Sequence, residues 1–141
     1  MKKFVLILAT VTLFNTNVLA YNVSDIDTNI NQYTEILPKN IAIVYLNYNL
    51  TISSGKAACY GYTKTQSGYS AKVKVELQRK GTTWTTIKSW EKTSTSSSAT
   101  IDETYSVLKG YSYRLKTTHY ALNSSGSVVE STVKYSSTVR Y

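Results

Sequence analysis

The sequence predicts an all-β fold of about seven strands, arranged as a sandwich or a small barrel. Three observations support this prediction. Beyond Ile41, apolar residues recur at every second position, which is the pattern of strands with one buried face. Polar turns separate these runs at intervals of roughly ten residues. The chain is also rich in serine, threonine and tyrosine, with thirteen tyrosines in 141 residues, and these residue types suit half-buried pleated surfaces.

The N-terminus has the features of a secretory signal peptide, which we expect to span residues 1–20. Two lysines precede an apolar run that starts at Phe4, and a small-residue exit ends at Ala20. The apolar run is too short to cross a bilayer, and no later stretch is a candidate transmembrane segment. We therefore expect a secreted, extracellular mature chain, with an uncleaved N-terminal anchor as the alternative.

Residues 21–38 are predicted to form an acidic leader, either a short helix or a flexible segment. Apolar side chains between Ile26 and Leu37 follow a spacing of four, three and four, as on one face of a helix, and Pro38 would end that helix. The leader has three acids and no base, so it could lie on the basic remainder of the chain. Residues 39–141 are then one β-sandwich domain, large enough to bury a core.

Alternating stretches of this domain are predicted to be strands. The clearest is YSAKVKVELQR (residues 69–79), whose alanine, valines and leucine share one face. In GKAACYGYTKT (residues 55–65) the inward face is ambiguous, because both faces are small or aromatic. The other predicted strands are IAIVYLNYNLTIS (41–53), TWTTIKSW (83–90), ATIDETYSV (99–107), YSYRLKTTHYA (111–121) and VVESTVKYSSTVRY (128–141).

Cys59 is the only cysteine, so the chain has no internal disulfide. We expect a buried thiol that acts as a small apolar side chain. The chain is then a monomer, and a Cys59-linked dimer is the alternative.

The charge of the chain is strongly basic, with a formal net value of +8. Loss of the signal peptide would remove two of the sixteen bases and none of the eight acids, which leaves a net charge of about +6. Such a chain is drawn to anionic surfaces such as envelope polymers, acidic glycans or membranes. Alternatively, the charge only aids solubility. Nucleic acid is not an expected partner, because the chain is predicted to be extracellular and carries no nucleic-acid motif.

One passage resembles a known family of domains. The stretch ATIDETYSVLKGYSYRLKTTHYA (residues 99–121) resembles the passage from strand E to strand F of immunoglobulin-like and fibronectin type III domains. Leu108 and Gly110 occupy the turn, and Tyr113 stands where the corner tyrosine bonds back to that turn. The resemblance implies an antiparallel β-sandwich, although the paired cysteines of antibody domains are absent. A second resemblance is to a group of short secreted proteins of Gram-positive bacteria that has no assigned activity, and it rests on the stretches VELQRKGTTWTTIKSW and GYSYRLKTTH. This resemblance implies secretion but no particular activity.

The immunoglobulin-like strand order places four of these strands in one sheet, whose solvent side is a candidate binding face. This placement assumes that Ile87, Val129 and Val133 point inward; alternatively, one or both tryptophans turn inward at a bulge. Aromatic rings stack on sugar rings, and bases bind carboxylates or phosphates. The residues expected on the face are Lys72, Lys74, Trp84, Lys88, Trp90, Arg114, Lys116, Tyr120 and Lys134.

Catalytic, metal and cofactor sites are not expected. His119 is the only histidine, and strict alternation places it on the inner face near the end of its strand, where we expect a structural residue at the margin of the core with its polar edge in water. A Cys59–His119 pair would lie inside, where a thiol is inert. One histidine and one cysteine cannot supply a zinc site. Asp102 and Glu103 are neighbours on a strand and point to opposite faces, so they are no paired-carboxylate site.

These patterns together predict a secreted, non-enzymatic protein that binds an extracellular anionic or glycan-rich surface. The alternative is a secreted cationic antimicrobial or toxin-like protein that acts on membranes. A membrane-active chain of this kind usually carries a long amphipathic basic helix, and no such pattern follows Pro38.

Overall fold

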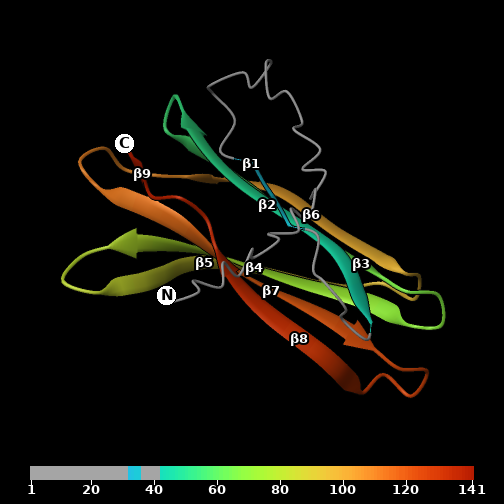
Figure 1. Cartoon of the computed structure of the whole chain (residues 1–141). Coiled ribbons are helices and arrows are strands. Elements are labelled where there is room, and N and C mark those ends of the chain that lie inside the picture. Colours follow the sequence, from blue (N-terminus) through green and yellow to red (C-terminus); the bar gives the residue numbers. More distant parts are fainter. Residues whose placement is uncertain (1–31, 36–41) are drawn as a thin grey trace, which may run out of the picture.

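A computed structural model describes residues 32–35 and 42–141, and the regular structure in these residues is all β-strand (Figure 1). The predicted all-β class is therefore confirmed for this part of the chain. The strands are β1 (Gln32–Glu35), β2 (Ile43–Ser53), β3 (Lys56–Thr65), β4 (Ser70–Lys80), β5 (Trp84–Thr93), β6 (Ser98–Ser106), β7 (Ser112–Leu122), β8 (Val128–Tyr135) and β9 (Val139–Arg140).

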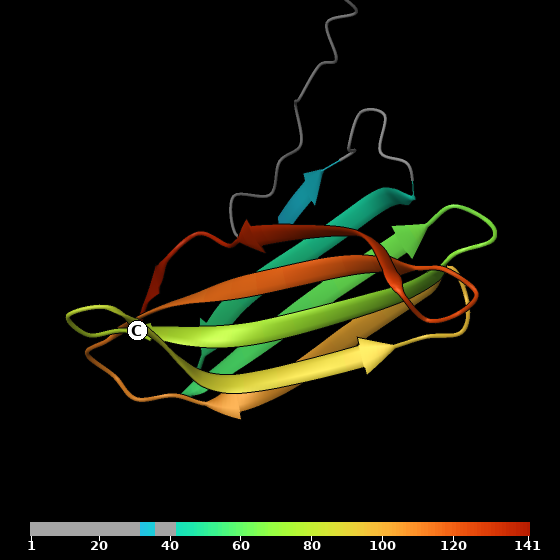
Figure 2. The same cartoon turned by 90° about the horizontal axis from the view of Figure 1, so that it is seen from below.

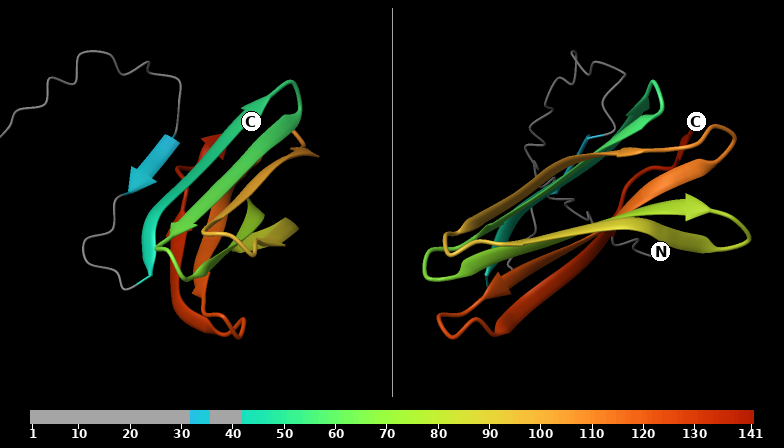
Figure 3. Two further views of the ribbon diagram at one scale, coloured as in Figure 1. Left: turned by 90° about the vertical axis from the view of Figure 1, so that its right-hand side faces the viewer. Right: turned by 180° about the vertical axis from the view of Figure 1, so that it is seen from behind.

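The strands form two antiparallel sheets that pack face to face. Sheet A has the order β1-β2-β3-β6, and sheet B has the order β5-β4-β7-β8, with β9 also paired to β7. The chain changes sheet between β3 and β4, between β5 and β6, and between β6 and β7. Figures 2 and 3 show the resulting two layers, in which β3 lies across from β4 and β2 lies across from β7. The fold is thus a β-sandwich.

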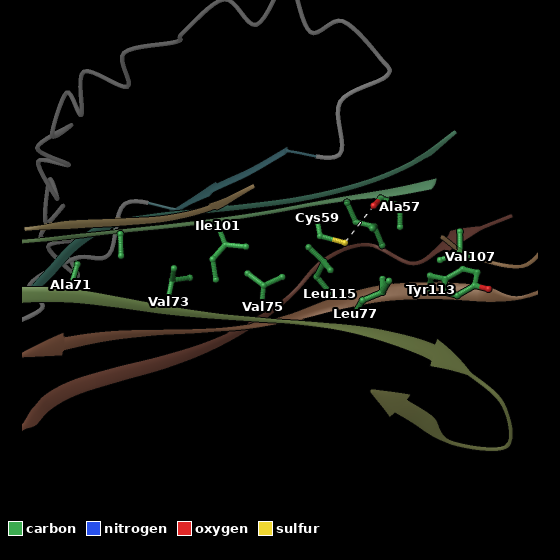
Figure 4. Close-up of a cluster of buried hydrophobic side chains, with 12 residues drawn as sticks. Ala57, Cys59, Ala71, Val73, Val75, Leu77, Ile101, Val107, Tyr113 and Leu115 are labelled. Carbon is green, nitrogen blue, oxygen red and sulfur yellow. Dashed lines mark hydrogen bonds between the residues drawn. The ribbon is translucent and has the colours of Figure 1, made fainter. Parts of the chain in front are cut away.

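The core between the sheets is built from the inner faces of the strands (Figure 4). Val73, Val75 and Leu77 of β4 are fully buried and point toward Cys59 and Ile101 of sheet A, as the alternation in their strand predicts. Burying one valine or leucine side chain contributes about 1.5–3 kcal/mol. The apolar side of β4 is therefore a main source of the energy that holds the sheets together.

The two sheets approach each other closely at Gly61 on β3. A Cβ atom at this position would lie 2.5 Å from Cγ2 of Val75 and 3.2 Å from Cγ2 of Val73. Valine side chains are stiff about their first torsion, so neither methyl group can move away cheaply. Glycine at position 61 therefore lets sheet A seat on the valines of β4.

A hydrogen bond from Tyr113 ties the connection between β6 and β7 to the core. The Tyr113 ring is buried, and its hydroxyl donates to the carbonyl oxygen of Leu108 (2.8 Å) and accepts from the Leu108 backbone N–H (3.1 Å). Gly110 takes a φ of +89° in the turn between these residues, a conformation that favours glycine. The hydrogen bond implied by the resemblance of this passage is present.

The N-terminal leader contributes a strand to the fold. Residues 32–35 lie in the segment predicted to be a helix or a flexible leader, and they form β1, with Glu35 opposite Leu46 on the free edge of β2. Pairing to an open sheet edge satisfies backbone groups that a strand edge otherwise leaves free, so the four residues are extended and not helical. The predicted signal peptide and the rest of the leader lie outside the described residues.

Candidate binding face

The solvent side of sheet B brings together most of the residues predicted for a binding face. Because paired residues of antiparallel strands point to the same side, the register of β4 and β7 sets the neighbours on this surface. We call it the outer face of sheet B. Its paired residues on β4 and β7 are Lys72 with Tyr120, Lys74 with Thr118, Glu76 with Lys116, and Gln78 with Arg114; β5 adds Trp84 and Glu91, β4 adds Lys80, and β8 adds Tyr135.

Two carboxylates partly neutralise the five bases of this face. Glu76 lies between Lys74 and Lys116, at 3.7 and 3.6 Å, and Lys72 pairs with Glu91 at 2.9 Å. Ion pairs at the surface contribute only about 0–1 kcal/mol each, and they exchange partners easily. The face is therefore basic in balance, and its lysines can pair with an incoming anion.

Arg114 is the most strongly organised residue of the face. The carbon centre of its guanidinium group lies 4.3 Å from the ring centroids of both Trp84 and Tyr135, so the cation stands between two aromatic rings. The Nε atom of Arg114 donates a hydrogen bond to Oε1 of Gln78 (2.9 Å). The ammonium group of Lys80 also lies over the Trp84 ring, 5.4 Å from its centroid. Cation–π contacts of this kind contribute about 0.5–2 kcal/mol. The aromatic rings thus hold a guanidinium plane in place at the surface.

Two residues predicted for the outer face lie on the other side of β5. Trp90 is opposite the buried Val75 and packs against the core, with its ring edge-on to Tyr105 (centroids 6.4 Å apart). Lys88 is opposite Leu77 and its ammonium lies 5.7 Å from the Trp90 ring centroid. The prediction that Trp84, Lys88 and Trp90 share the face is wrong for the last two, and the alternative that a tryptophan turns inward at a bulge is confirmed for Trp90. A bulge opposite Leu77 and Gln78 adds a residue to β5 and reverses the direction of its side chains.

The last long strand has the opposite phase from the predicted one. Lys134 is opposite the buried Thr117 on the inner side, while Val133 is opposite Thr118 on the outer side and is 46% exposed. The inner side of β8 also carries Glu130, whose carboxylate accepts the backbone N–H groups of Ala42 and Ile43 at 2.8 and 3.0 Å. Because β8 is an edge strand, its inner side can face polar groups and its apolar residues can face solvent. Lys134 is therefore not part of the outer face of sheet B.

His119 is more deeply buried than predicted. Its side chain is fully buried, with Nδ1 2.8 Å from the hydroxyl of Thr63 and Nε2 3.0 Å from the hydroxyl of Thr117. The pKa of His119 is lowered from 6.5 to about 4, mainly by burial; a hydrogen bond to the backbone of Tyr62 opposes this shift, and the nearby charge of Lys134 adds to it. Its inner-face position agrees with the predicted alternation, but the expected contact of its polar edge with water is wrong. Both ring nitrogens are engaged inside the sandwich.

Cys59 lies in the apolar part of the same interior. It is fully buried, and its thiol points to the carbonyl oxygen of Ala57 at 3.8 Å. Burial raises the pKa of Cys59 to about 12, so the thiolate needed for nucleophilic or redox chemistry is not formed at neutral pH. Cys59 packs as a small apolar side chain, as the sequence suggested.

Sequence reasoning missed several residues that complete the two solvent faces. Tyr135 alternates in phase with Val129 and Val133, which the sequence predicts to point inward, and its contact with Arg114 depends on a strand pairing that no local pattern records. On sheet A, Asn49, Tyr60 and Asp102 lie side by side on the solvent side. The alternation of alanine and glycine with tyrosine around Cys59 was a usable signal for this face, because only the small residues fit against β4.

The described residues contain no group of three metal-binding side chains, and no helix in them is long and apolar enough to cross a membrane. Comparison of the chain with protein-family models, with curated proteins and with solved structures finds no match.

Proposed function

We propose that the protein is a secreted, non-enzymatic binding module that attaches to an anionic or glycan-rich extracellular surface through the outer face of sheet B. The observation that carries this proposal is the guanidinium group of Arg114, held between Trp84 and Tyr135 amid four lysines. A planar cation fixed in this way loses little conformational entropy when it binds a phosphate or carboxylate. The surrounding lysines add long-range attraction for the same groups.

The proposed non-enzymatic role rests on the state of the two side chains best suited to catalysis. His119 donates and accepts hydrogen bonds only within the interior, and the Cys59 thiol is buried with a raised pKa. Neither can reach a substrate without opening the sandwich. A base and a nucleophile that act together need hydrogen-bond contact, and His119 uses both of its nitrogens on threonines.

We further propose that the sandwich is of the fibronectin type III kind. Support comes from its strand order, with three long strands in one sheet and the order β5-β4-β7-β8 in the other, and from the hydroxyl of Tyr113 bonded back to Leu108. In domains of this architecture, function lies in the surface and not in the fold itself. A fibronectin type III fold therefore implies no activity beyond the binding proposed for the outer face of sheet B.

The test uses poly(glycerol phosphate), a polyanion without sugar rings, immobilised and titrated with the purified chain. We expect binding that weakens as the salt concentration rises, because salt screens the attraction between the lysines and the phosphate groups. Replacing Lys74, Lys80 and Lys116 together by glutamine should weaken binding by about tenfold or more. Replacing Trp84 by alanine should weaken binding too, because Arg114 loses one of its two rings.

A matched triple variant separates a binding face from net charge alone. Lys56→Gln, Lys64→Gln and Lys109→Gln change the net charge by the same amount but lie away from the outer face of sheet B. This variant should keep most of the affinity. Equal losses in both triple variants would mean that the positive charge acts without a defined site, and leakage of vesicles at the same protein concentrations would favour action on membranes.

A further inference from the structure

Sheet A carries a row of three polar side chains on its solvent side, opposite the face discussed above. The register places Asn49 of β2 opposite Tyr60 of β3, and Tyr60 opposite Asp102 of β6. These three strands run side by side, so the residues form a straight row across the sheet (Figure 1). With strands about 4.8 Å apart, the backbones of the two outer members are about 10 Å apart. An amide and a carboxylate therefore flank a phenol ring.

A hollow lies beside this row because the next outward residue on β3 is small. Ala58 is two positions from Tyr60 and is paired with Thr51 on one side and Thr104 on the other. Asn49, Ala58, Tyr60 and Asp102 line a cavity of about 270 Å³. One face of the Tyr60 ring can thus meet a ligand seated over the alanine.

Asn49, which lines the hollow, carries a hydrogen-bond acceptor that has no partner. Oδ1 of Asn49 is shielded from solvent and has no hydrogen-bond partner, and the same holds for Oδ1 of Asn47. An unpaired buried acceptor costs about 1–3 kcal/mol. The last torsion of an asparagine side chain is soft, so a small rotation lets the amide of Asn49 meet a donor that enters the hollow.

The hydroxyl of Tyr60 remains a donor over a wide pH range. Burial, and then the neighbouring Tyr62, Tyr45 and Asp102, raise the pKa of Tyr60 above its ordinary value. Tyr62 itself is braced by an edge-on contact with Tyr45, with ring centroids 5.7 Å apart. The phenol that lines the hollow is therefore neutral, while Asp102 supplies a negative charge.

We propose that this hollow binds one pyranose unit of a glycan. A sugar ring has C–H groups on its faces and hydroxyl donors around its rim. The C–H groups match the apolar face of the Tyr60 ring, and the hydroxyl donors match the Asp102 carboxylate and the unsatisfied Asn49 amide oxygen. An anionic ligand is disfavoured by Asp102, and an extended peptide would need a free sheet edge instead of this hollow within the sheet. The inference does not depend on the outer face of sheet B, because the two surfaces lie on opposite sheets.

The test is a titration of the purified chain with cellotetraose, maltotetraose and chitotetraose, followed by calorimetry and by saturation transfer in NMR spectra. At least one tetrasaccharide should bind. Ala58→Leu should abolish that binding by filling the hollow, and Tyr60→Ala should weaken it by about tenfold. Tyr111→Ala, which removes an exposed tyrosine elsewhere, should leave it unchanged.

Two further measurements keep the inference separate from the proposed function. Thermal unfolding of Ala58→Leu should match that of the parent chain, and its affinity for poly(glycerol phosphate) should also be unchanged. The inference is overturned if no tetrasaccharide binds at millimolar concentration, or if Ala58→Leu binds as well as the parent. Binding of choline but of no saccharide would also overturn it, because it would identify the hollow as a cation site.

Discussion

At the scale of single residues, the interior of the sandwich is divided into an apolar part around Cys59 and a polar part around His119. Both residues are fully buried, and both are neutral at pH 7, because burial raises the pKa of Cys59 to about 12 and the pKa of His119 is lowered to about 4. Thr63 and Thr117 bind its two nitrogens. The cost of charging this imidazole in the folded state therefore sets a pH dependence of stability.

We expect the protein to lose stability as the pH falls from about 6.5 to about 4. The pKa of His119 is near 6.5 in the unfolded chain and about 4 in the fold, so within this window the unfolded state binds a proton that the folded state does not. Stability contributed by the neutral imidazole is complete above pH 6.5 and is reduced by about 3 kcal/mol near pH 4. Urea unfolding at several pH values measures this change in the free energy of unfolding. In His119→Gln the slope in this window should be much smaller, and an unchanged slope would contradict the assignment.

The hydroxyl of Tyr113 should contribute measurably to stability. Tyr113→Phe removes the bond donated to the Leu108 carbonyl and the bond accepted from the Leu108 N–H, and we expect a loss of about 1–2 kcal/mol in urea unfolding. Tyr111→Phe, at an exposed tyrosine in the same turn, is the matched control. Equal stability of the two variants would mean that the corner hydrogen bond contributes nothing.

Sequence alone could place residues on faces but could not identify their partners. The inner residues of β4 were predictable because each inward valine or leucine alternates with a charged residue. His119 was placed on the correct side for the same reason. Its complete burial was not predictable, because it depends on Thr63, which is remote in sequence and comes from the opposite sheet.

At the scale of whole strands, the two edges of sheet B are where the predictions differ from the structure. In β5 a bulge reverses the side chains, and in β8 the inner side is polar. Central strands are constrained by packing on two sides, whereas edge strands tolerate bulges and mixed faces. The alternation rule therefore predicted β4 and β7 well and failed in β5 and β8.

Glu130 should act as a clamp between β8 and the start of β2. Its carboxylate accepts two backbone N–H groups, from Ala42 and Ile43, across the gap between the sheets. In Glu130→Gln we expect faster hydrogen exchange at these two amides and a loss of about 1–3 kcal/mol of stability, because charge-assisted bonds are replaced by weaker ones. Glu103→Gln, at an exposed carboxylate of β6, should change neither quantity. Unchanged exchange at Ala42 and Ile43 would contradict the clamp.

At the scale of the whole molecule, the sandwich presents two different solvent faces. The outer face of sheet B has five bases, among them the stacked Arg114, and two acids, whereas the solvent side of sheet A has tyrosines, asparagines, two lysines and an aspartate. Net charge was readable from composition, but its concentration on one sheet was not, because it follows from the pairing of β4 with β7. The difference between the faces is the basis for assigning polyanion binding to sheet B.

The most direct measurement of this assignment is an NMR titration of the isotope-labelled chain with poly(glycerol phosphate) at low salt. If the polymer binds the outer face of sheet B, the largest amide shifts occur on β4 and β7, at Lys72, Lys74, Arg114 and Lys116. The indole signal of Trp84 then shifts, whereas that of Trp90 does not. Shifts spread evenly over all lysines, or gathered on sheet A around Lys56 and Lys64, would contradict it.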